Sequence, residues 1–241
     1  MKIGIFGKGR LGSAIAQEVA CASDLELIWH VGRGEAPTAR ADIALDASIG
    51  EAVPEHIDWA LASGTDLVIG TTGWEMPELG ERIDRHIGAL VAPNFSLGVA
   101  LMARLATVMG RFGALDPELD PYILDHHHRA KADAPSGTAK RLAQAVMQGC
   151  PRKENWTLGA PAPQELSVAV VRAGSEFGMH TVGLDGPAET LTLVHRARSR
   201  ALFAQGALGA ARWLHGKKGL YTFDTYASEM LDPLFVFGEL P

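Results

Sequence analysis

The chain opens with a short apolar run followed at once by a glycine-rich turn. Lys2–Phe6 is typical of a strand, and Gly7-Lys8-Gly9-Arg10-Leu11-Gly12 fits the pattern G-x-G-x-x-G before a helical pattern that runs to about Ala22. In this order the first glycine makes a tight turn, the second lets a pyrophosphate approach the backbone, and the third lets helix and strand pack closely. The opening therefore predicts a dinucleotide-binding unit, with a merely glycine-rich turn as the alternative.

Strand and helix patterns go on alternating through the first hundred residues. Strands are predicted at Leu25–Val31, Ile43–Ala47, Leu67–Gly70 and Ala89–Ala92, and helices at Glu51–Ala62 and Pro77–Ile87. Such alternation predicts a doubly wound parallel sheet of the Rossmann type. The stretch between Gly32 and Asp42 is too short for a full crossover helix, so this part of the unit is expected to be trimmed.

Two of the strand ends carry small and polar residues that suit a ligand. They are Gly70-Thr71-Thr72-Gly73 and Ala92-Pro93-Asn94-Phe95-Ser96. Ligands of such sheets bind outside the carboxyl ends of the strands, where small residues let a nicotinamide ribose lie against the backbone. The same residue types are common turn formers, so plain loop chemistry is the alternative.

The end of the second strand bears on cofactor choice. Enzymes that select NAD usually place an acid there to bind the ribose hydroxyls. This chain has Gly32-Arg33-Gly34 and no acid until Glu35. Because Arg33 can pair with a 2′-phosphate, the sequence favours NADPH over NADH. An exposed loop arginine without a role is the alternative.

The character of the chain changes after Ser96. A long apolar helix is expected to about Phe112, and the elements predicted after it are a strand at Pro121–Asp125, a helix at Ser136–Met147, a Pro- and Gly-containing connection at Gly149–Gln164, strands at Leu166–Arg172, His180–Leu184 and Glu189–Arg196, and a helix at Ala201–Leu214. Strands gathered late, with one crossover helix, predict a smaller α+β domain with an open mixed sheet whose exposed face can pair with another subunit. The last helix and the tail from Gly216 are expected to return to the first domain. The predicted division is residues 1–96 and 201–241 for dinucleotide binding, and residues 97–200 for substrate binding and oligomerisation.

One stretch concentrates groups that can do chemistry, from Asp125 through His126, His127, His128 and Lys131 to Ser136-Gly137-Thr138. Imidazoles titrate near neutrality and exchange protons, and a lysine can bind a carboxylate or deliver a proton. Ser136 is predicted as an N-cap that leaves the amides of Gly137 and Thr138 free to bind an anion. Three neighbouring histidines on a strand make a poor tetrahedral zinc site, so no metal is expected. An ordinary helix start is the simpler alternative.

Composition limits the partners of the chain. It has 241 residues, 47% hydrophobic and 21% charged, with a net charge of −6. The net charge argues against nucleic acid, and no apolar run reaches membrane-spanning length. Cys21 and Cys150 lack CxxC spacing, so neither a disulfide framework nor a metal cluster is expected. Without a signal-peptide pattern, a cytoplasmic location is the expectation.

Taken together, these motifs resemble the 4-hydroxy-tetrahydrodipicolinate reductase (dihydrodipicolinate reductase) family of lysine and diaminopimelate biosynthesis. The resemblance covers essentially the whole chain and rests on GKGRLG at Gly7–Gly12, VIGTTGW at Val68–Trp74, APNFSLGV at Ala92–Val99, DHHHRAKADAPSGTA at Asp125–Ala139, VRAG at Val171–Gly174, and HTV followed by ETLTLVHRARSR. The family implies an NAD(P)H-dependent enzyme that transfers hydride to C4 of a cyclic unsaturated dicarboxylate, and it implies a homotetramer.

The resemblance also implies roles for individual residues. His127 matches the family's proton donor/acceptor and Lys131 its proton donor, whereas His128, Gly137 and Thr138 match substrate contacts. Cofactor contacts would fall on Gly7, Lys8, Gly9, Arg10, Leu11, Gly12, Arg33, Gly70, Thr71, Thr72, Ala92, Pro93, Asn94 and Phe95.

The chain departs from the family pattern in five places: Asp125 stands for Glu, His126 is additional, Gly32 replaces an acid, the third strand ends in Asp46-Ala47-Ser48, and the chain is short around the second strand. Two other functions stay open, which are a different Rossmann amino-acid dehydrogenase and a nucleotide-binding regulator without catalysis.

Overall fold

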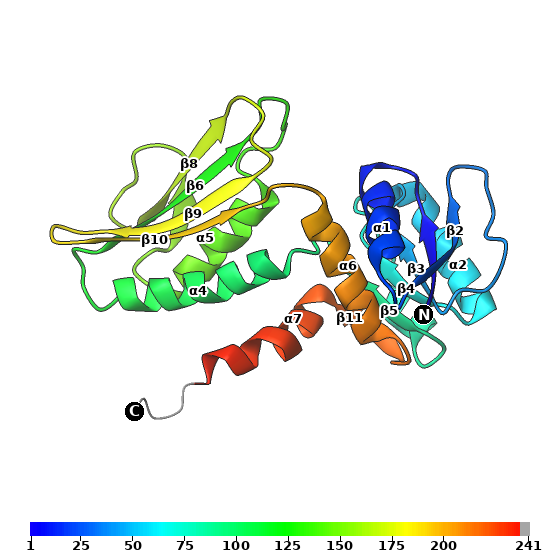
Figure 1. The fold of residues 1–241 in the computed structure, drawn as a ribbon. Helices are drawn as coiled ribbons and strands as arrows, with labels where there is room; N and C mark the ends of the chain where they lie inside the picture. Colours follow the sequence, from blue (N-terminus) through cyan, green and yellow to red (C-terminus); the bar gives the residue numbers. More distant parts are fainter. Residues whose placement is uncertain (237–241) are drawn as a thin grey trace. The chain divides into compact units, whose positions relative to one another are not determined.

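The computed structural model describes residues 1–236, which form two compact units (Figure 1). The first unit comprises Met1–Ser96 and the chain from Arg200 onward, and the second comprises Leu97–Ser199. Each unit has a sheet of its own. Within residues 1–236, no helix is both long and apolar enough to cross a lipid bilayer.

The first unit is built on a six-stranded sheet in the order β11-β5-β4-β3-β1-β2. All neighbours pair in parallel. Its strands are β1 (Lys2–Phe6), β2 (Glu26–Val31), β3 (Ile43–Asp46), β4 (Asp66–Ile69), β5 (Gly88–Val91) and β11 (Gly219–Thr222). The four residues of each of β3 and β4 are buried, as expected for strands covered on both faces. The predicted doubly wound sheet is confirmed.

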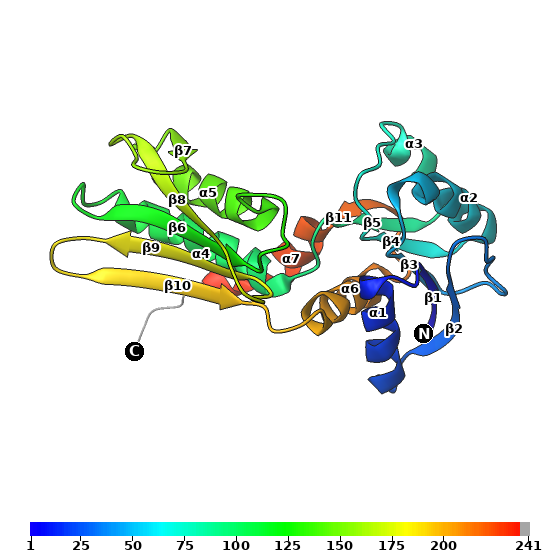
Figure 2. The same ribbon diagram turned by 90° about the horizontal axis from the view of Figure 1, so that it is seen from above.

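Helices cover both faces of this sheet (Figures 1 and 2). On one face α1 (Arg10–Cys21) packs beside α6 (Ala201–Leu214), and the other face carries α2 (Val53–Ser63), preceded by the short η1 (Gly50–Ala52), and α3 (Leu79–Ile83). Phe6, Ile57 and Leu67 belong to the core on the α2 side. No helix forms between residues 32 and 42, as the short spacing predicted.

Two predictions for the first unit need correction. The helix predicted at Pro77–Ile87 shrinks to the five residues of α3, because the backbone at Asp84 turns to a φ of 33° that a helix cannot hold. The tail from Gly216 does return to this unit, but it does so as a strand that was not predicted. This strand, β11, pairs with β5 and is followed by α7 (Phe223–Leu231) and η2 (Asp232–Phe235).

The second unit has a five-stranded mixed sheet in the order β10-β9-β6-β8-β7. The strands are β6 (Asp120–His127), β7 (Asn155–Thr157), β8 (Glu165–Arg172), β9 (Met179–Asp185) and β10 (Thr190–Arg196). β6 pairs in parallel with β8 and antiparallel with β9. Two helices, α4 (Leu97–Gly113) and α5 (Gly137–Gly149), cover one face of this sheet (Figure 1). The predicted mixed sheet is therefore confirmed.

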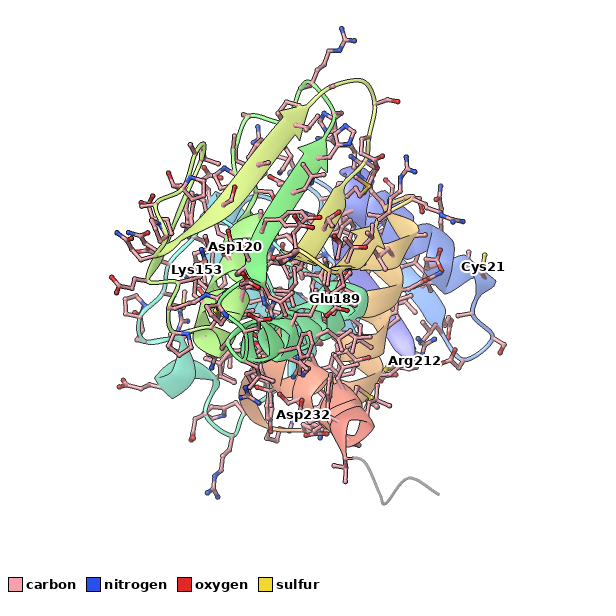
Figure 3. All side chains as sticks on the ribbon, turned by 90° about the vertical axis from the view of Figure 1, so that its left-hand side faces the viewer. Cys21, Asp120, Lys153, Glu189, Arg212 and Asp232 are labelled. Carbon is pink, nitrogen blue, oxygen red and sulfur yellow. The ribbon has the colours of Figure 1, made fainter. Side chains whose placement is uncertain are left out.

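The connection predicted at Gly149–Gln164 contains the short strand β7, which was missed. Next to it Lys153 is buried, with its Nζ 2.7 Å from Asp120 Oδ1 and also donating to the carbonyls of Pro163 and Glu165 (both side chains of the ion pair are labelled in Figure 3). A buried cation satisfied by three oxygens fixes this connection against the start of β6.

Candidate active site

The glycine-rich turn has the geometry that its three glycines predict. Gly7 has a φ of +100°, and a Cβ there would lie 2.3 Å from the Ala47 carbonyl oxygen. A Cβ on Gly12 would lie 1.8 Å from the Gly7 oxygen, so only glycine lets α1 pack this closely. At Gly9 a Cβ would meet nothing within 4 Å, and this residue caps α1 without a side-chain hydrogen bond. An open backbone at the start of a helix suits a pyrophosphate.

A cleft of about 610 Å³ lies beside this turn. Lys8 and Arg33 line it, together with Glu35, His56 and Trp59. The carboxylate of Glu35 accepts a hydrogen bond from the Gly32 amide at 2.8 Å and lies 2.5 Å from Lys8 Nζ. Glu35 therefore lies on this cleft three residues after Gly32, with its carboxylate already engaged by the Gly32 amide and Lys8.

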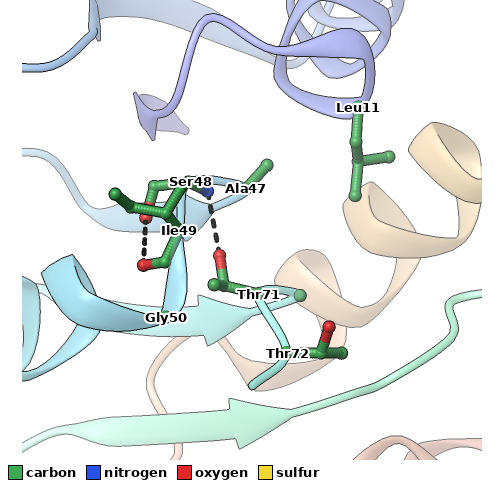
Figure 4. A pocket seen from close by; sticks show the side chains of 8 residues that line it. Leu11, Ala47, Ser48, Ile49, Gly50, Thr71 and Thr72 are labelled. Atoms are coloured by element: carbon green, nitrogen blue, oxygen red, sulfur yellow. Dashed lines mark hydrogen bonds between the residues drawn. The ribbon is translucent and has the colours of Figure 1, made fainter. Parts of the chain in front are cut away.

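A second hollow of about 380 Å³ in the same unit is lined by Leu11, Gly50 and Gly70–Thr72 (Figure 4). The Thr71 side chain is buried, and its hydroxyl donates to Asp46 Oδ1 at 2.6 Å and accepts from the Ser48 amide at 2.9 Å. The Thr71 hydroxyl is thus engaged inside the protein, and its carbonyl accepts from Trp74 Nε1 at 2.8 Å, whereas Thr72 is exposed.

Asp46, which the sequence did not single out for a role, organises the floor of this hollow. It is 1% exposed and lies 2.6 Å from His56 Nδ1. Burial opposes the charge of Asp46, but hydrogen bonds from His56, Ser48 and Thr71 outweigh burial and lower the pKa of the carboxyl. The ring of His56 stacks on Phe6 at 3.8 Å between centroids, which fixes the imidazole against the strand.

The predicted segment Ala92–Phe95 follows β5, where a cofactor of a parallel sheet would bind. Ala92 and Phe95 are buried, and the Phe95 ring lies against Phe223 at 5.8 Å. The Asn94 side chain accepts from the Ser96 amide at 2.8 Å, while Pro93 is exposed. These side chains shape the end of the strand, so a ligand here would meet mainly backbone.

In the second unit the histidine-rich stretch alternates along the last residues of β6. Asp125 and His127 are buried on the helix-covered side, and His126 between them points to the other face. The strand ends at His127, where the chain turns, with the Lys131 amide donating to the His128 carbonyl at 3.1 Å. His128 is half-buried in this turn, and its amide donates to the Glu176 carbonyl. Extended geometry therefore ends at His127.

Asp125 is fully buried and joins several polar groups. Its Oδ2 accepts from the Ser136 amide at 2.7 Å and from Arg172 Nη2 at 2.8 Å, and its Oδ1 accepts from the Ser136 hydroxyl at 3.0 Å. His127 Nδ1 lies 2.9 Å from Oδ1 in a close contact that lacks hydrogen-bond geometry. Burial would raise the pKa of Asp125, but hydrogen bonds from His180, Arg172 and Ser136 hold it far below its usual value.

His127 and Lys131, the two predicted proton donors, differ in charge. Burial and the nearby cationic groups together lower the pKa of His127 to about 4, against the attraction of Asp125. Its imidazole is therefore neutral at neutral pH. Lys131 Nζ lies 2.7 Å from Asp133 Oδ1, and this contact lowers the pKa of Asp133. The pair offers a neutral base beside a charged donor.

The start of α5 is the predicted anion site. Ser136 caps the helix, with its hydroxyl accepting from the Ala139 amide at 3.1 Å, and no acid lies in the first turn. Gly137 is exposed, and a Cβ there would meet nothing within 4 Å. Through Asp125, this helix start is joined to His127, so the two halves of the predicted site are brought together.

Sequence reasoning missed three contributors to this site. Arg172 and His180 bind Asp125 from β8 and β9. Gly178 lies so close that a Cβ on it would stand 3.0 Å from His127 Nε2. The motifs VRAG and HTV contain Arg172 and His180 and were noted, but their roles depend on strand pairings that no local pattern shows.

Comparison with known proteins decides the family. A family model described as dihydrodipicolinate reductase, N-terminus, matches residues 1–95, and one described as dihydrodipicolinate reductase, C-terminus, matches residues 98–226. The chain belongs to the dihydrodipicolinate reductase family. The two matched regions meet close to the boundary between the two units.

Individual members of this family support the assignment. The chain is 38% identical over 201 residues to a 4-hydroxy-tetrahydrodipicolinate reductase of Magnetococcus marinus, covering 79% of this chain and 74% of the relative. It is 35% identical over 246 residues to the enzyme of the same name from Methanoregula boonei, covering 91% and 95%.

Among solved structures, a dipicolinate-bound dihydrodipicolinate reductase from Paenisporosarcina sp. TG-14 has the same fold. The match has a TM-score of 0.74 at 24% identity and covers 92% of this chain and 97% of the other. An amine dehydrogenase from Mycobacterium smegmatis has a TM-score of 0.57 at 11% identity and shares the general fold.

Proposed function

We propose that this chain reduces 4-hydroxy-tetrahydrodipicolinate with a reduced nicotinamide cofactor, as a step of lysine and diaminopimelate biosynthesis. The single observation that carries the proposal is the shared carboxylate of Asp125, which contacts both His127 and Ser136. It joins a proton-transfer group to a helix start suited to a substrate carboxylate. The relatives named above carry this activity in their names.

The 4-hydroxyl would leave as water, and the cofactor would supply a hydride to C4 of the ring. The residues of the chain would bind both molecules and supply the proton. The open backbone at Gly9 would receive the pyrophosphate, and the cleft beside Lys8 and Arg33 would receive the adenosine. The free amides of Gly137 and the half-buried Thr138 would hold a carboxylate of the ring. His128 is the remaining substrate contact that the family resemblance implies.

Of the two candidate donors, we assign protonation of the reduced ring to Lys131. The Lys131 side chain is held as an ion pair with Asp133, whereas burial lowers the pKa of His127 to about 4 and leaves its imidazole without the additional acidic proton at neutral pH. His127 would then contact the substrate as a neutral hydrogen-bonding group. A bound dicarboxylate would raise the pKa of His127 and bring the two groups closer in acidity.

NADPH is the favoured cofactor in this proposal, because Arg33 lines the cleft and the position directly after β2 holds no acid. The proposed assembly is a homotetramer formed through the uncovered face of the second unit's sheet. The cytoplasmic location expected from the sequence remains a prediction.

A coupled assay with enzymatically generated substrate tests the reaction. We expect the purified protein to oxidise NADPH only when the substrate is generated. Lys131→Met should lower kcat by at least about a hundredfold, because a positioned proton donor contributes a factor of that order. His127→Gln, which replaces a neutral hydrogen-bonding contact, should lower kcat/KM for the substrate by about tenfold. NADPH affinity, followed by cofactor fluorescence, should stay unchanged, since both side chains lie in the second unit.

His126→Gln is the matched control, because this neighbouring histidine points to the opposite face of β6 and should leave kcat unchanged. Tight NADPH binding without turnover would instead establish a nucleotide-binding regulator. Turnover of other oxo or imino acids alone would establish a different dehydrogenase.

A further inference from the structure

His180 is a buried imidazole that the predicted mechanism does not use. It lies on β9 directly across from Asp125 on β6 and from His195 on β10, and it is 5% exposed. Its Nε2 lies 3.1 Å from the Ser136 hydroxyl and 3.3 Å from Asp125 Oδ1. The ring therefore touches both the cap of α5 and the carboxylate beside His127.

The contacts of the Ser136 hydroxyl fix the direction of this hydrogen bond. The hydroxyl has one proton, which it donates to Asp125 Oδ1, and it already accepts from the Ala139 amide. An unprotonated Nε2 would face two oxygens without a proton to share. His180 must therefore carry its proton on Nε2 and donate it into the pair formed by Ser136 and Asp125.

We propose that His180 is a positioning residue for the reduction: its Nε2–H holds the Ser136 hydroxyl and the Asp125 carboxylate together and so fixes the anion-binding start of α5 against His127. This inference rests on the proposed function, in which that helix start binds the substrate carboxylate. His180 itself touches neither substrate nor cofactor in this scheme, and it acts through Ser136. Its loss should weaken substrate binding without disturbing the cofactor.

A metal site is the competing interpretation of the same residues. One ligand atom each from Asp125, His127 and His180 lie within 4.8 Å of one another. The Arg172 guanidinium, 2.8 Å from Asp125 Oδ2, places a positive charge where a cation would bind. The Ser136 amide and hydroxyl also occupy both carboxylate oxygens. To bind a metal through Nε2, His180 would also have to lose the Nε2 proton that it donates to Ser136. The geometry therefore favours the hydrogen-bonded cluster.

Kinetics of three variants test the proposal. His180→Leu removes the donor. We expect KM for the dicarboxylate to rise about tenfold, which is the loss expected for one buried hydrogen bond to a charged pair. KM for NADPH should stay within about twofold of the wild-type value. His180→Gln keeps an N–H donor and should recover most of the wild-type KM. His195→Leu is the matched control. This half-buried histidine lies on the next strand and, among the described residues, makes no hydrogen bond or ion pair with Ser136 or Asp125, so its loss should leave both constants unchanged.

An unchanged substrate KM in folded His180→Leu would overturn the proposal, as would equal losses in His180→Gln and His180→Leu. Loss of activity of the wild-type protein on treatment with a metal chelator would overturn it in favour of the metal site.

Nuclear magnetic resonance of the wild-type protein gives a test that needs no variant. Long-range ¹H–¹⁵N spectra report which ring nitrogen of each histidine carries the proton, and His180 should be the Nε2–H tautomer. The Nδ1–H tautomer would overturn the inference even if His180→Leu fails to fold. A wild-type protein without reductase activity would count against the proposed function. The position of the proton on the His180 ring would still show whether His180 donates to Ser136 and Asp125.

Discussion

At the scale of single residues, we expect cofactor choice to depend on Arg33 and Glu35, which follow β2. Glu35 is held by the Gly32 amide and by Lys8, whereas Arg33 has no ion pair among the residues that the structure describes. A 2′-phosphate in the cleft would therefore find Arg33 available. We expect Arg33→Ala to raise KM for NADPH about tenfold and to change KM for NADH less than about twofold. Steady-state kinetics with each cofactor measures both.

Arg40→Ala is a suitable control for this prediction. Arg40 is also exposed, but it donates to the Gly64 carbonyl at 3.2 Å and does not line the cleft. It should change neither constant. Equal losses with NADPH and NADH in Arg33→Ala would mean that Arg33 does not read the 2′-phosphate.

Some residues of the candidate site belong to one continuous sequence motif, and others reach the site only through the pairing of distant strands. His127, Lys131 and Ser136 could be predicted because one continuous motif contains them. Arg172 and His180 could not be assigned, since they meet Asp125 only through the pairing of β8 and β9 with β6. A buried carboxylate collects its partners from other strands, and no spacing within the chain encodes that.

At the scale of elements, α5 begins at the proposed anion site, and its packing on α4 depends on two glycines. A Cβ on Gly149 would lie 2.2 Å from the Thr107 carbonyl oxygen, and one on Gly110 would lie 2.4 Å from the Val146 oxygen. Both contacts are with backbone, which cannot rotate away. We expect Gly149→Ala to lower the free energy of unfolding by about 1–3 kcal/mol, the usual cost of overpacking. Denaturant unfolding followed by circular dichroism measures this.

The control for this element is Gly80→Ala in α3. There a Cβ would have its nearest neighbour at 3.9 Å, so helix propensity should dominate and stability should rise or stay level. If Gly149→Ala is as stable as the wild type, α4 and α5 are not in the close contact described.

The elements that periodicity predicted well are long and amphipathic, such as α6, whose predicted bounds agree with the structure. The errors fall on short ones. β7 and β11 have three and four residues, and they exist because a neighbouring strand edge is there to pair with them. α3 was predicted too long because a helical pattern does not reveal the turn at Asp84.

At the scale of the whole molecule, the chain leaves the first unit after Ser96 and returns to it near Arg200. The return was predictable in outline from the late Ala- and Gly-rich helix. Its reason is visible in the structure, because a Cβ on Gly206 would lie 1.7 Å from the Phe95 carbonyl oxygen. Only glycine at position 206 lets α6 lie this close to the backbone of Phe95, which follows β5.

The uncovered sheet face of the second unit provides the last prediction. This face points away from α4 and α5. It presents Val194, which is 55% exposed, and Val171, which is 37% exposed, and the pairing of β10, β9, β6 and β8 places both valines on it. Exposed valines on a flat sheet favour association with a second copy of the chain. We expect Val194→Glu to convert the proposed tetramer to smaller species, measured by sedimentation velocity, because a desolvated charge opposes the contact.

Val108→Glu, at a valine of 46% exposure on α4, is the matched control and should keep the wild-type assembly. A Val194→Glu protein that sediments like the wild type would show that this face is not an interface.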